Sequence, residues 1–254
     1  MTASIEQLSD NAKIFGGGQT MNLSPRFFRF GAVCAVLTAL TTLVVHIVPN
    51  LWADATSFEQ QVALRLNPIY MAQRWTILVH CALVIMSMFV LGAAKLRQAP
   101  ALVSFGFLGY LCFGFTEILR TSISIFAVNR TWRAGYAAAA DDATRERFHS
   151  LITAYAGVNE AMFFVFYTGF LIGLACYGMA FLRSEGRKSH LGVLFLVWAL
   201  LDVPGFIDAI TGTESLGRNF EWVGPYFLPL ARLYVGVWLW RNAESLGSTL
   251  EQRA

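Results

Sequence analysis

Charged residues are scarce in this chain of 254 residues. Only 14% of its side chains are Asp, Glu, Lys or Arg, whereas 56% are apolar, and the mean hydropathy is +0.53. Soluble domains carry about 25% charged residues, so the composition excludes an ordinary soluble domain and a disordered chain. The net charge is only +3, and no basic run alternates with aromatic residues. A nucleic-acid-binding surface is therefore not expected.

Cysteine and histidine are also few, with four of each. Each cysteine lies in an apolar run and none forms a C-x-x-C pair, so we expect packing residues and no zinc site or disulfide. Four histidines are too few for a multi-histidine di-iron site. The chain has no G-x-S-x-G, H-E-x-x-H, phosphate-loop or G-x-G-x-x-G motif. No common motif therefore predicts an enzyme or a metal centre.

Long apolar runs are abundant instead. A membrane-spanning helix needs about 20 residues, and six runs reach that length, at 27–49, 71–95, 101–128, 158–182, 191–212 and 222–241. We therefore predict an all-α fold, a polytopic membrane helical bundle of six transmembrane helices. This membrane domain covers residues 26–241, between a flexible tail at 1–25 and a second tail at 242–254.

The orientation follows from the positions of Lys and Arg. Basic residues of the short loops gather on the side of the two tails, and the opposite short loops carry few. Because short cytoplasmic loops are enriched in Lys and Arg, we predict that both termini are cytoplasmic and that the protein lies in the inner (plasma) membrane.

The connection at 129–157 is the only long one and is predicted to be external. Its sequence has helical periodicity, and Asp141 and Asp142 favour a helix N-terminus there. Two interpretations remain open. The segment forms an additional external amphipathic helix at the mouth of the bundle, or it is a long extension of the fourth span.

Ionisable side chains lie within the predicted spans, although their burial in a bilayer is costly and commonly marks function. Four are near the membrane midplane: Glu117, Arg120, Asp202 and Arg232. Others lie closer to the external face, whereas the inner halves of the spans carry almost none. The candidate ligand-binding residues are thus Glu117, Arg120, Asp202, Arg232, Thr116, Glu160, Asp208 and Arg74.

Two interpretations of the midplane charges are compatible with the sequence. Two acids and two bases could form internal salt bridges that lock the bundle, or they could form the floor of an outward-facing pocket. His46 and His80 add a third alternative, a b-type haem between two helices. Their depths differ by roughly 7 Å at 1.5 Å per residue, so hydrogen-bonded structural histidines are favoured, and no cofactor or metal is expected.

Two stretches resemble a bacterial membrane family of unknown function, domain of unknown function 4386. They are GFLGYLCFGFTEILRTSI at 106–123 and VNEAMFFVFYTGFLIGLACYGMAFLRS at 158–184. The first is similar to the family's glycine- and aromatic-rich third span, although here the acid, Glu117, precedes the base, Arg120. The resemblance implies a six-span fold and no particular reaction.

We predict an integral membrane protein that binds or transports a small or amphipathic ligand through an outward-facing polar pocket. The first alternative is a structural or accessory subunit of a larger membrane complex, whose charges serve as internal salt bridges. The second is a membrane enzyme or b-type cytochrome. The expected partners are the lipid bilayer, a lipid-like ligand, and further membrane proteins or a second copy of the chain, without nucleic acid.

Overall fold

The computed structural model describes residues 23–52, 54–183, 189–213, 216–220 and 222–251. This part of the chain is helical, without strands. Its elements are α2 (Pro25–Ile47), η1 (Val48–Trp52), α3 (Phe58–Ala63), η2 (Leu64–Leu66), α4 (Pro68–Ala93), α5 (Pro100–Ile123), η3 (Ser124–Trp132), α6 (Arg133–Ala138), α7 (Asp142–Leu182), α8 (Ser189–Thr211), η5 (Gly217–Phe220), η6 (Val223–Phe227) and α9 (Leu228–Glu251). The all-helical prediction is confirmed. Most of the tail predicted at 1–25 lies outside the described residues.

Local sequence explains where the long helices begin. Proline occupies the first turn of α2, α4 and α5, where no intrahelical N–H bond is lost. Ser24, Asn67 and Asp141 then accept hydrogen bonds from the free backbone N–H groups that follow them. The predicted starts of the first three spans agree with the structure to within three residues.

Five of the helical segments are long and apolar enough to cross a membrane: Pro25–Trp52, Pro68–Ala93, Pro100–Ala138, Asp142–Leu182 and His190–Thr211. Their outward faces are apolar. Phe105, Phe115 and Leu200 are each more than 60% exposed, which is the reverse of a soluble surface and is typical of a membrane protein.

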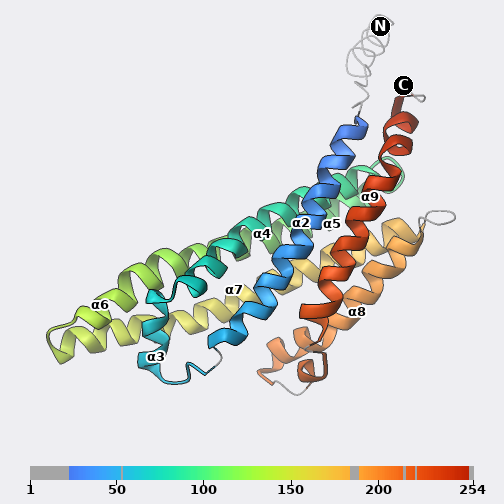
Figure 1. Ribbon diagram of the computed structural model, residues 1–254. Coiled ribbons are helices and arrows are strands. Elements are labelled where there is room, and N and C mark those ends of the chain that lie inside the picture. Colours follow the sequence, from blue (N-terminus) through green and yellow to red (C-terminus); the bar gives the residue numbers. More distant parts are fainter. Residues whose placement is uncertain (1–22, 53, 184–188, 214–215, 221, 252–254) are drawn as a thin grey trace, which may run out of the picture.

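Helix α9 is not among these five segments. It was predicted to span at 222–241, but Pro225 and Pro229 delay regular α-helix, and the π-helix η6 precedes a start at Leu228. The helix then continues to Glu251, through most of the segment predicted as the second tail, and includes Arg232, Arg241, Glu244 and Glu251. It nevertheless runs beside α2 (Figure 1).

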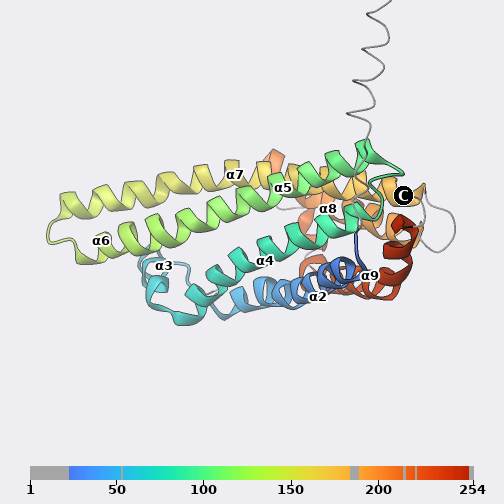
Figure 2. The ribbon, with the colours of Figure 1, turned by 90° about the horizontal axis from the view of Figure 1, so that it is seen from above.

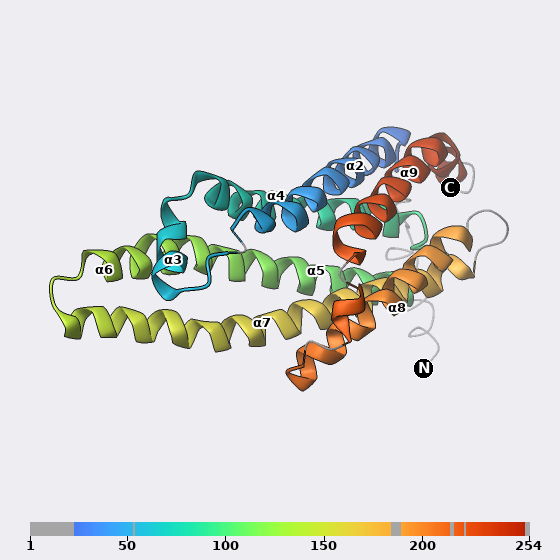
Figure 3. The same ribbon diagram turned by 60° about the horizontal axis from the view of Figure 1, so that its bottom comes forward.

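A long helical hairpin dominates the shape. Residues 100–138 form one nearly continuous helix through α5, η3 and α6, and the 41-residue α7 returns antiparallel to it. At 1.5 Å per residue α7 is about 60 Å long, twice the thickness of a bilayer core. The tip of the hairpin therefore projects beyond the other long helices, with α3 against it (Figures 2 and 3).

The segment predicted at 129–157 is thus a helical extension and not a separate amphipathic helix. Residues 142–157 form the first turns of α7, so the second of the two sequence interpretations holds. The tip is stabilised by aromatic contacts, in which Phe58 of α3 packs on Tyr136 and His149 at centroid distances of 5.0 and 4.4 Å. Hydropathy did not reveal this continuity because a helix outside the bilayer needs no apolar run.

The bundle has two unlike halves. The half that contains the start of α2 and the end of α9, here called the terminal half, is filled by core side chains such as Phe28, Met88, Tyr177, Phe181, Phe195 and Leu239, each fully buried. Helices approach closely there and at mid-bundle: a Cβ added to Gly109 would lie 2.6 Å from the Gly169 carbonyl oxygen. The other half, here called the cavity half, is hollow.

Candidate functional site

A cavity of about 490 Å³ occupies the cavity half. It is lined by the last turns of α2, the first half of α4, the second half of α5, the middle of α7, the second half of α8, η5, η6 and the first turns of α9. All these parts lie toward the same end of the bundle, away from the start of α2 and the end of α9 (Figure 1). Most of the ionisable residues that the sequence places in one half of the spans line this cavity.

The wall of the cavity is largely aromatic. Phe113, Phe163, Phe166, Tyr167 and Phe170 line one side, and neighbouring rings lie 4.6 to 6.3 Å apart between centroids. The hydroxyl of Tyr167 donates to the Asp202 carbonyl oxygen at 3.1 Å, just before Pro204 in α8. An aromatic wall with a few polar groups is the usual make-up of a small-molecule site.

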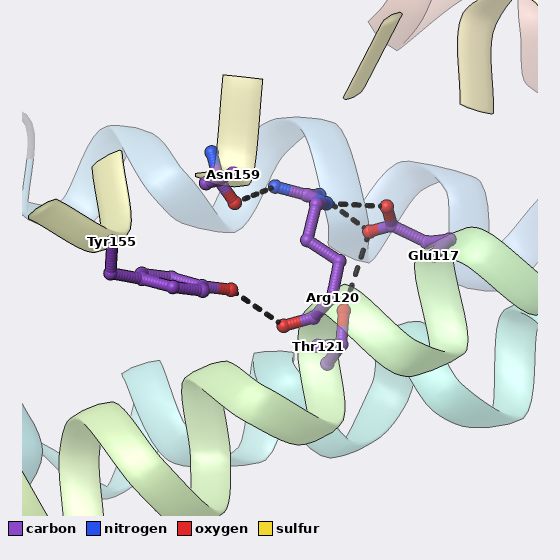
Figure 4. A network of polar contacts seen from close by, with 5 residues as sticks. All are labelled: Glu117, Arg120, Thr121, Tyr155 and Asn159. Carbon is purple, nitrogen blue, oxygen red and sulfur yellow. Dashed lines mark hydrogen bonds and ion pairs between the residues drawn. The ribbon is translucent and has the colours of Figure 1, made fainter. Parts of the chain in front are cut away.

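Glu117 and Arg120 form the predicted polar pair on α5. Arg120 donates from Nε and Nη2 to the two carboxylate oxygens at 2.7 and 2.6 Å, and Glu117 is only 5% exposed. Asn159 accepts from Arg120 Nη1 at 3.0 Å, and Tyr155 donates to the Arg120 carbonyl oxygen at 2.9 Å. Figure 4 shows that α5 and α7 together hold this arginine in one orientation.

In the described part of the chain, Arg232 has no such partner. It lines the cavity from α9 and is 2% exposed, with its Cζ 4.8 Å from the centre of the Trp198 ring. Among the described residues no carboxylate lies within 4.0 Å of it, and its Nη1 has no hydrogen-bond acceptor. The predicted network of internal salt bridges therefore holds for Glu117 and Arg120 but is wrong for Arg232.

Asp202 and Arg74 also line the cavity without ion pairs in the described part of the chain. The Oδ2 atom of Asp202 and the Nε atom of Arg74 are buried and lack hydrogen-bond partners there. The cavity is therefore lined by three guanidinium groups and two carboxylates, of which one of each is paired. Burying unpaired charge is costly, so these groups differ from the paired Glu117 and Arg120.

The two histidines predicted as a haem alternative both line the cavity, His46 from α2 and His80 from α4. His80 Nδ1 lies 2.8 Å from Thr41 Oγ1, a hydrogen bond within the helix pair. Among the described residues, no group of three or more His, Cys, Asp or Glu side chains could hold a metal ion.

Three candidate residues are not brought to the cavity. Thr116 is partly buried and Glu160 is exposed, and neither lines the cavity. The carboxylate of Asp208 is engaged elsewhere, because it accepts from Gly217 N at 2.6 Å and Thr213 Oγ1 at 2.7 Å. Asp208 thus anchors the segment that follows α8, and no free carboxylate oxygen faces the cavity from this position.

Sequence reasoning did not select the aromatic wall or Gln73 and Arg133. The aromatic residues share the 3–4 residue spacing of ordinary core positions, so nothing in the pattern distinguishes a wall from a core. The sequence places Arg133 in the external connection, because hydropathy does not predict the continuation of α5 through η3.

Comparisons with known proteins are negative: no family model, no curated protein and no solved structure matches this chain. The resemblance of residues 106–123 and 158–184 to the family of unknown function stays a prediction.

Proposed function

We propose that this chain is a six-span inner-membrane protein with cytoplasmic termini that binds or transports a small or amphipathic ligand. The sixth span is α9, because it lies along α2, which is itself long and apolar enough to span. Gly236 permits this close approach, since a Cβ there would lie 3.0 Å from the Ala32 carbonyl oxygen. The segregation of basic residues in the sequence supports the orientation.

The observation that carries the proposal is Arg232, a buried guanidinium that lines a cavity of about 490 Å³ and has no acid partner among the described residues. A buried charge that only stabilised the fold would be expected to be paired, as Arg120 is. An anionic or strongly accepting group of a ligand would satisfy Arg232, and the unpartnered Asp202 Oδ2 would accept from a donor on the same ligand.

The aromatic wall supports an amphipathic ligand over a purely polar one. Phe113, Phe163 and Phe166 offer ring faces and edges to an apolar chain or ring system, which gains by leaving water or lipid for a close-fitting pocket. The cavity volume lies in the usual range of about 300–1,000 Å³ for small-molecule sites.

The terminal half supports binding, or transport by alternating access, over a permanent pore. Its fully buried rings, among them Tyr177, Phe181 and Phe195, pack against one another. They fill the space between the cavity and the end of the bundle where α2 begins and α9 ends. The resting state is therefore open only toward the external side, and passage would require these helices to move.

The experiment measures retention of a native molecule. The full chain is extracted with a mild maltoside detergent, and the bound small molecules are identified and quantified by native mass spectrometry. Wild type is compared with Leu201→Trp, which fills the cavity from α8. Leu200→Trp is the matched control, because Leu200 is the adjacent residue, is 70% exposed and does not line the cavity.

We expect an amphipathic molecule on wild type and on Leu200→Trp, and its loss from Leu201→Trp. Arg232→Gln should also lose it while leaving the apolar wall intact. Equal retention by all variants, or no retained molecule on wild type, would contradict ligand binding in this cavity and would favour a structural subunit.

A further inference from the structure

A second pocket, of about 250 Å³, adjoins the cavity on the side of the long hairpin. Three arginines line it, Arg74, Arg120 and Arg133, together with Tyr70, Tyr155 and Asn159. None of the described carboxylates is among its lining residues. The pocket shares Arg74 and Arg120 with the inner cavity, yet a larger share of its wall is polar.

The π-helix η3 explains how Arg133 reaches this pocket. The wider turn of a π-helix leaves local backbone groups free and is frequent at functional sites. Here the side chain of Asn129 uses both of its ends: Nδ2 donates to the Ser124 carbonyl oxygen at 2.6 Å, and Oδ1 accepts from Arg133 Nη1 at 2.9 Å. A buried amide therefore fixes the helix and the arginine together, Asn129 being only 2% exposed.

Tyr70 holds two of the guanidinium groups by neutral contacts. The Cζ atoms of Arg74 and Arg133 lie 4.8 and 5.9 Å from the centre of its ring, and Arg133 Nη1 lies 3.4 Å from its hydroxyl. The Nε atoms of both arginines are buried without a hydrogen-bond acceptor in the described part of the chain. Two donors are thus oriented but unsatisfied.

Charge at the pocket is unbalanced. Glu117 neutralises Arg120 through the bidentate pair, whereas neither Arg74 nor Arg133 forms an ion pair with any described residue. Like charges repel, most strongly where water is partly excluded. Guanidinium groups held in place by neutral partners, with donors free, form a preorganised site for an oxyanion, since arginine binds phosphate oxygens in pairs.

We propose that the pocket formed by Arg74, Arg120 and Arg133 binds a phosphate-type oxyanion. The anion is the phosphate of a lipid headgroup or free inorganic phosphate, which present the same oxygens to the three arginines. The site lies where α4 begins and where the hairpin leaves the bundle, the level expected for the external membrane surface. This anion is distinct from the ligand proposed for the inner cavity, whose binding is tested by Leu201→Trp and Arg232→Gln.

The test uses the full chain in a maltoside detergent, which carries no phosphate. Binding of inorganic phosphate and of dihexanoyl phosphatidic acid is measured by titration calorimetry, with dihexanoyl glycerol as the phosphate-free lipid. We expect saturable binding of a phosphate probe and none of dihexanoyl glycerol. Binding of both phosphate probes, or of inorganic phosphate alone, identifies a free-anion site, and binding of phosphatidic acid alone identifies a lipid-headgroup site.

Substitutions locate the site. Arg74→Gln and Arg133→Gln should each weaken binding by about tenfold or more, the usual effect of losing a hydrogen bond to a charged group. Arg130→Gln is the matched control: it removes the same charge three residues before Arg133, from η3, which leads directly into α6. Arg130 is exposed over Trp75 and Phe126 and does not line the pocket. It should change binding by less than about twofold.

Two results would overturn the proposal. Wild type that binds neither phosphate probe would show that the pocket is not an oxyanion site, whatever the variants do. Equal weakening by Arg130→Gln and Arg133→Gln would show that general positive charge, and not this pocket, attracts the anion. Circular dichroism establishes that each variant is folded, and if Arg133→Gln is not, Arg74→Gln carries the comparison alone.

Discussion

The terminal half and the cavity half are built from the same helices, but the first is closely packed and the second encloses a cavity. In the terminal half, rings such as Phe181, Phe195 and Trp238 pack edge to face or in stacks, and close glycine contacts bring the helices together. In the cavity half, similar rings stand around an open volume that holds paired and unpaired charge. Aromatic residues alone therefore do not distinguish the two halves, whereas Asp202 and Arg232, which form no ion pair among the described residues, lie beside the cavity's rings.

Removing a ring from the terminal half should destabilise the protein most. Phe195→Ala should destabilise the protein by about 3–5 kcal/mol, because a fully buried ring is removed and the close-packed surroundings cannot collapse. Phe166→Ala should cost only about 1–2 kcal/mol, since Phe166 already borders the cavity. Thermal unfolding of both variants in the same detergent gives the two values, and equal losses would contradict the distinction between the halves.

Two of the ion pairs, one in each half of the bundle, should also differ in their contribution to stability. Glu117→Gln should cost about 3 kcal/mol, because Arg120 would keep a largely buried charge without its acid. Glu244→Gln breaks the Arg29–Glu244 pair at the other end of the bundle, where the two side chains are 45% and 72% exposed, and should cost less than about 1 kcal/mol. Melting temperatures at low and high salt separate the two, since salt screens only the exposed pair.

The smallest effect is expected at the tip of the hairpin. Hydrogen bonds from Thr144, first from its backbone N–H and then from its hydroxyl, lower the pKa of Asp141 below its usual 3.8. A carboxylate with a lowered folded-state pKa stabilises the tip above its unfolded pKa, and this contribution disappears as pH falls through the folded pKa. As pH falls, the first turn of α7 should therefore fray more in wild type. Asp141→Asn should not show this increase.

Hydrogen exchange of the amides that follow Asp141 measures this fraying. Wild type and Asp141→Asn should differ in their pH dependence at the tip and agree in the bundle. A pH dependence in Asp141→Asn that equals that of wild type would show that another group controls the tip.

The sequence predicted the helical fold and the side on which polar groups gather, because both depend on residue type at each depth. It could not predict which charges meet. Spacing of three residues within one helix brings Glu117 to Arg120, but the partner of Arg232 depends on how α9 lies relative to α8. Regular α-helix begins only at Leu228, and among the described residues Arg232 forms no ion pair with either midplane acid.

The arginine pocket was still harder to predict. It depends on α5 continuing through a π-helix to Ala138, and the sequence gives only Asn129 and Arg133, four residues apart, as a sign of it. Hydropathy marks where a helix leaves the bilayer and not where it ends. The sequence therefore places Arg133 in an external connection, and nothing in the pattern links it to Arg74 and Arg120.

The accessibility of the cavity from the two sides of the membrane tests most directly whether the cavity is open only to the external side. Leu201→Cys places a thiol in the cavity, and Leu200→Cys places one on the outward face of the same helix. Both are made in a chain without the four native cysteines and exposed to a membrane-impermeant, charged thiol reagent in oriented vesicles. We predict that Leu201→Cys reacts only from the external side and Leu200→Cys from neither. Reaction of Leu201→Cys from the cytoplasmic side, or its failure to react from the external side, would contradict an outward-open cavity.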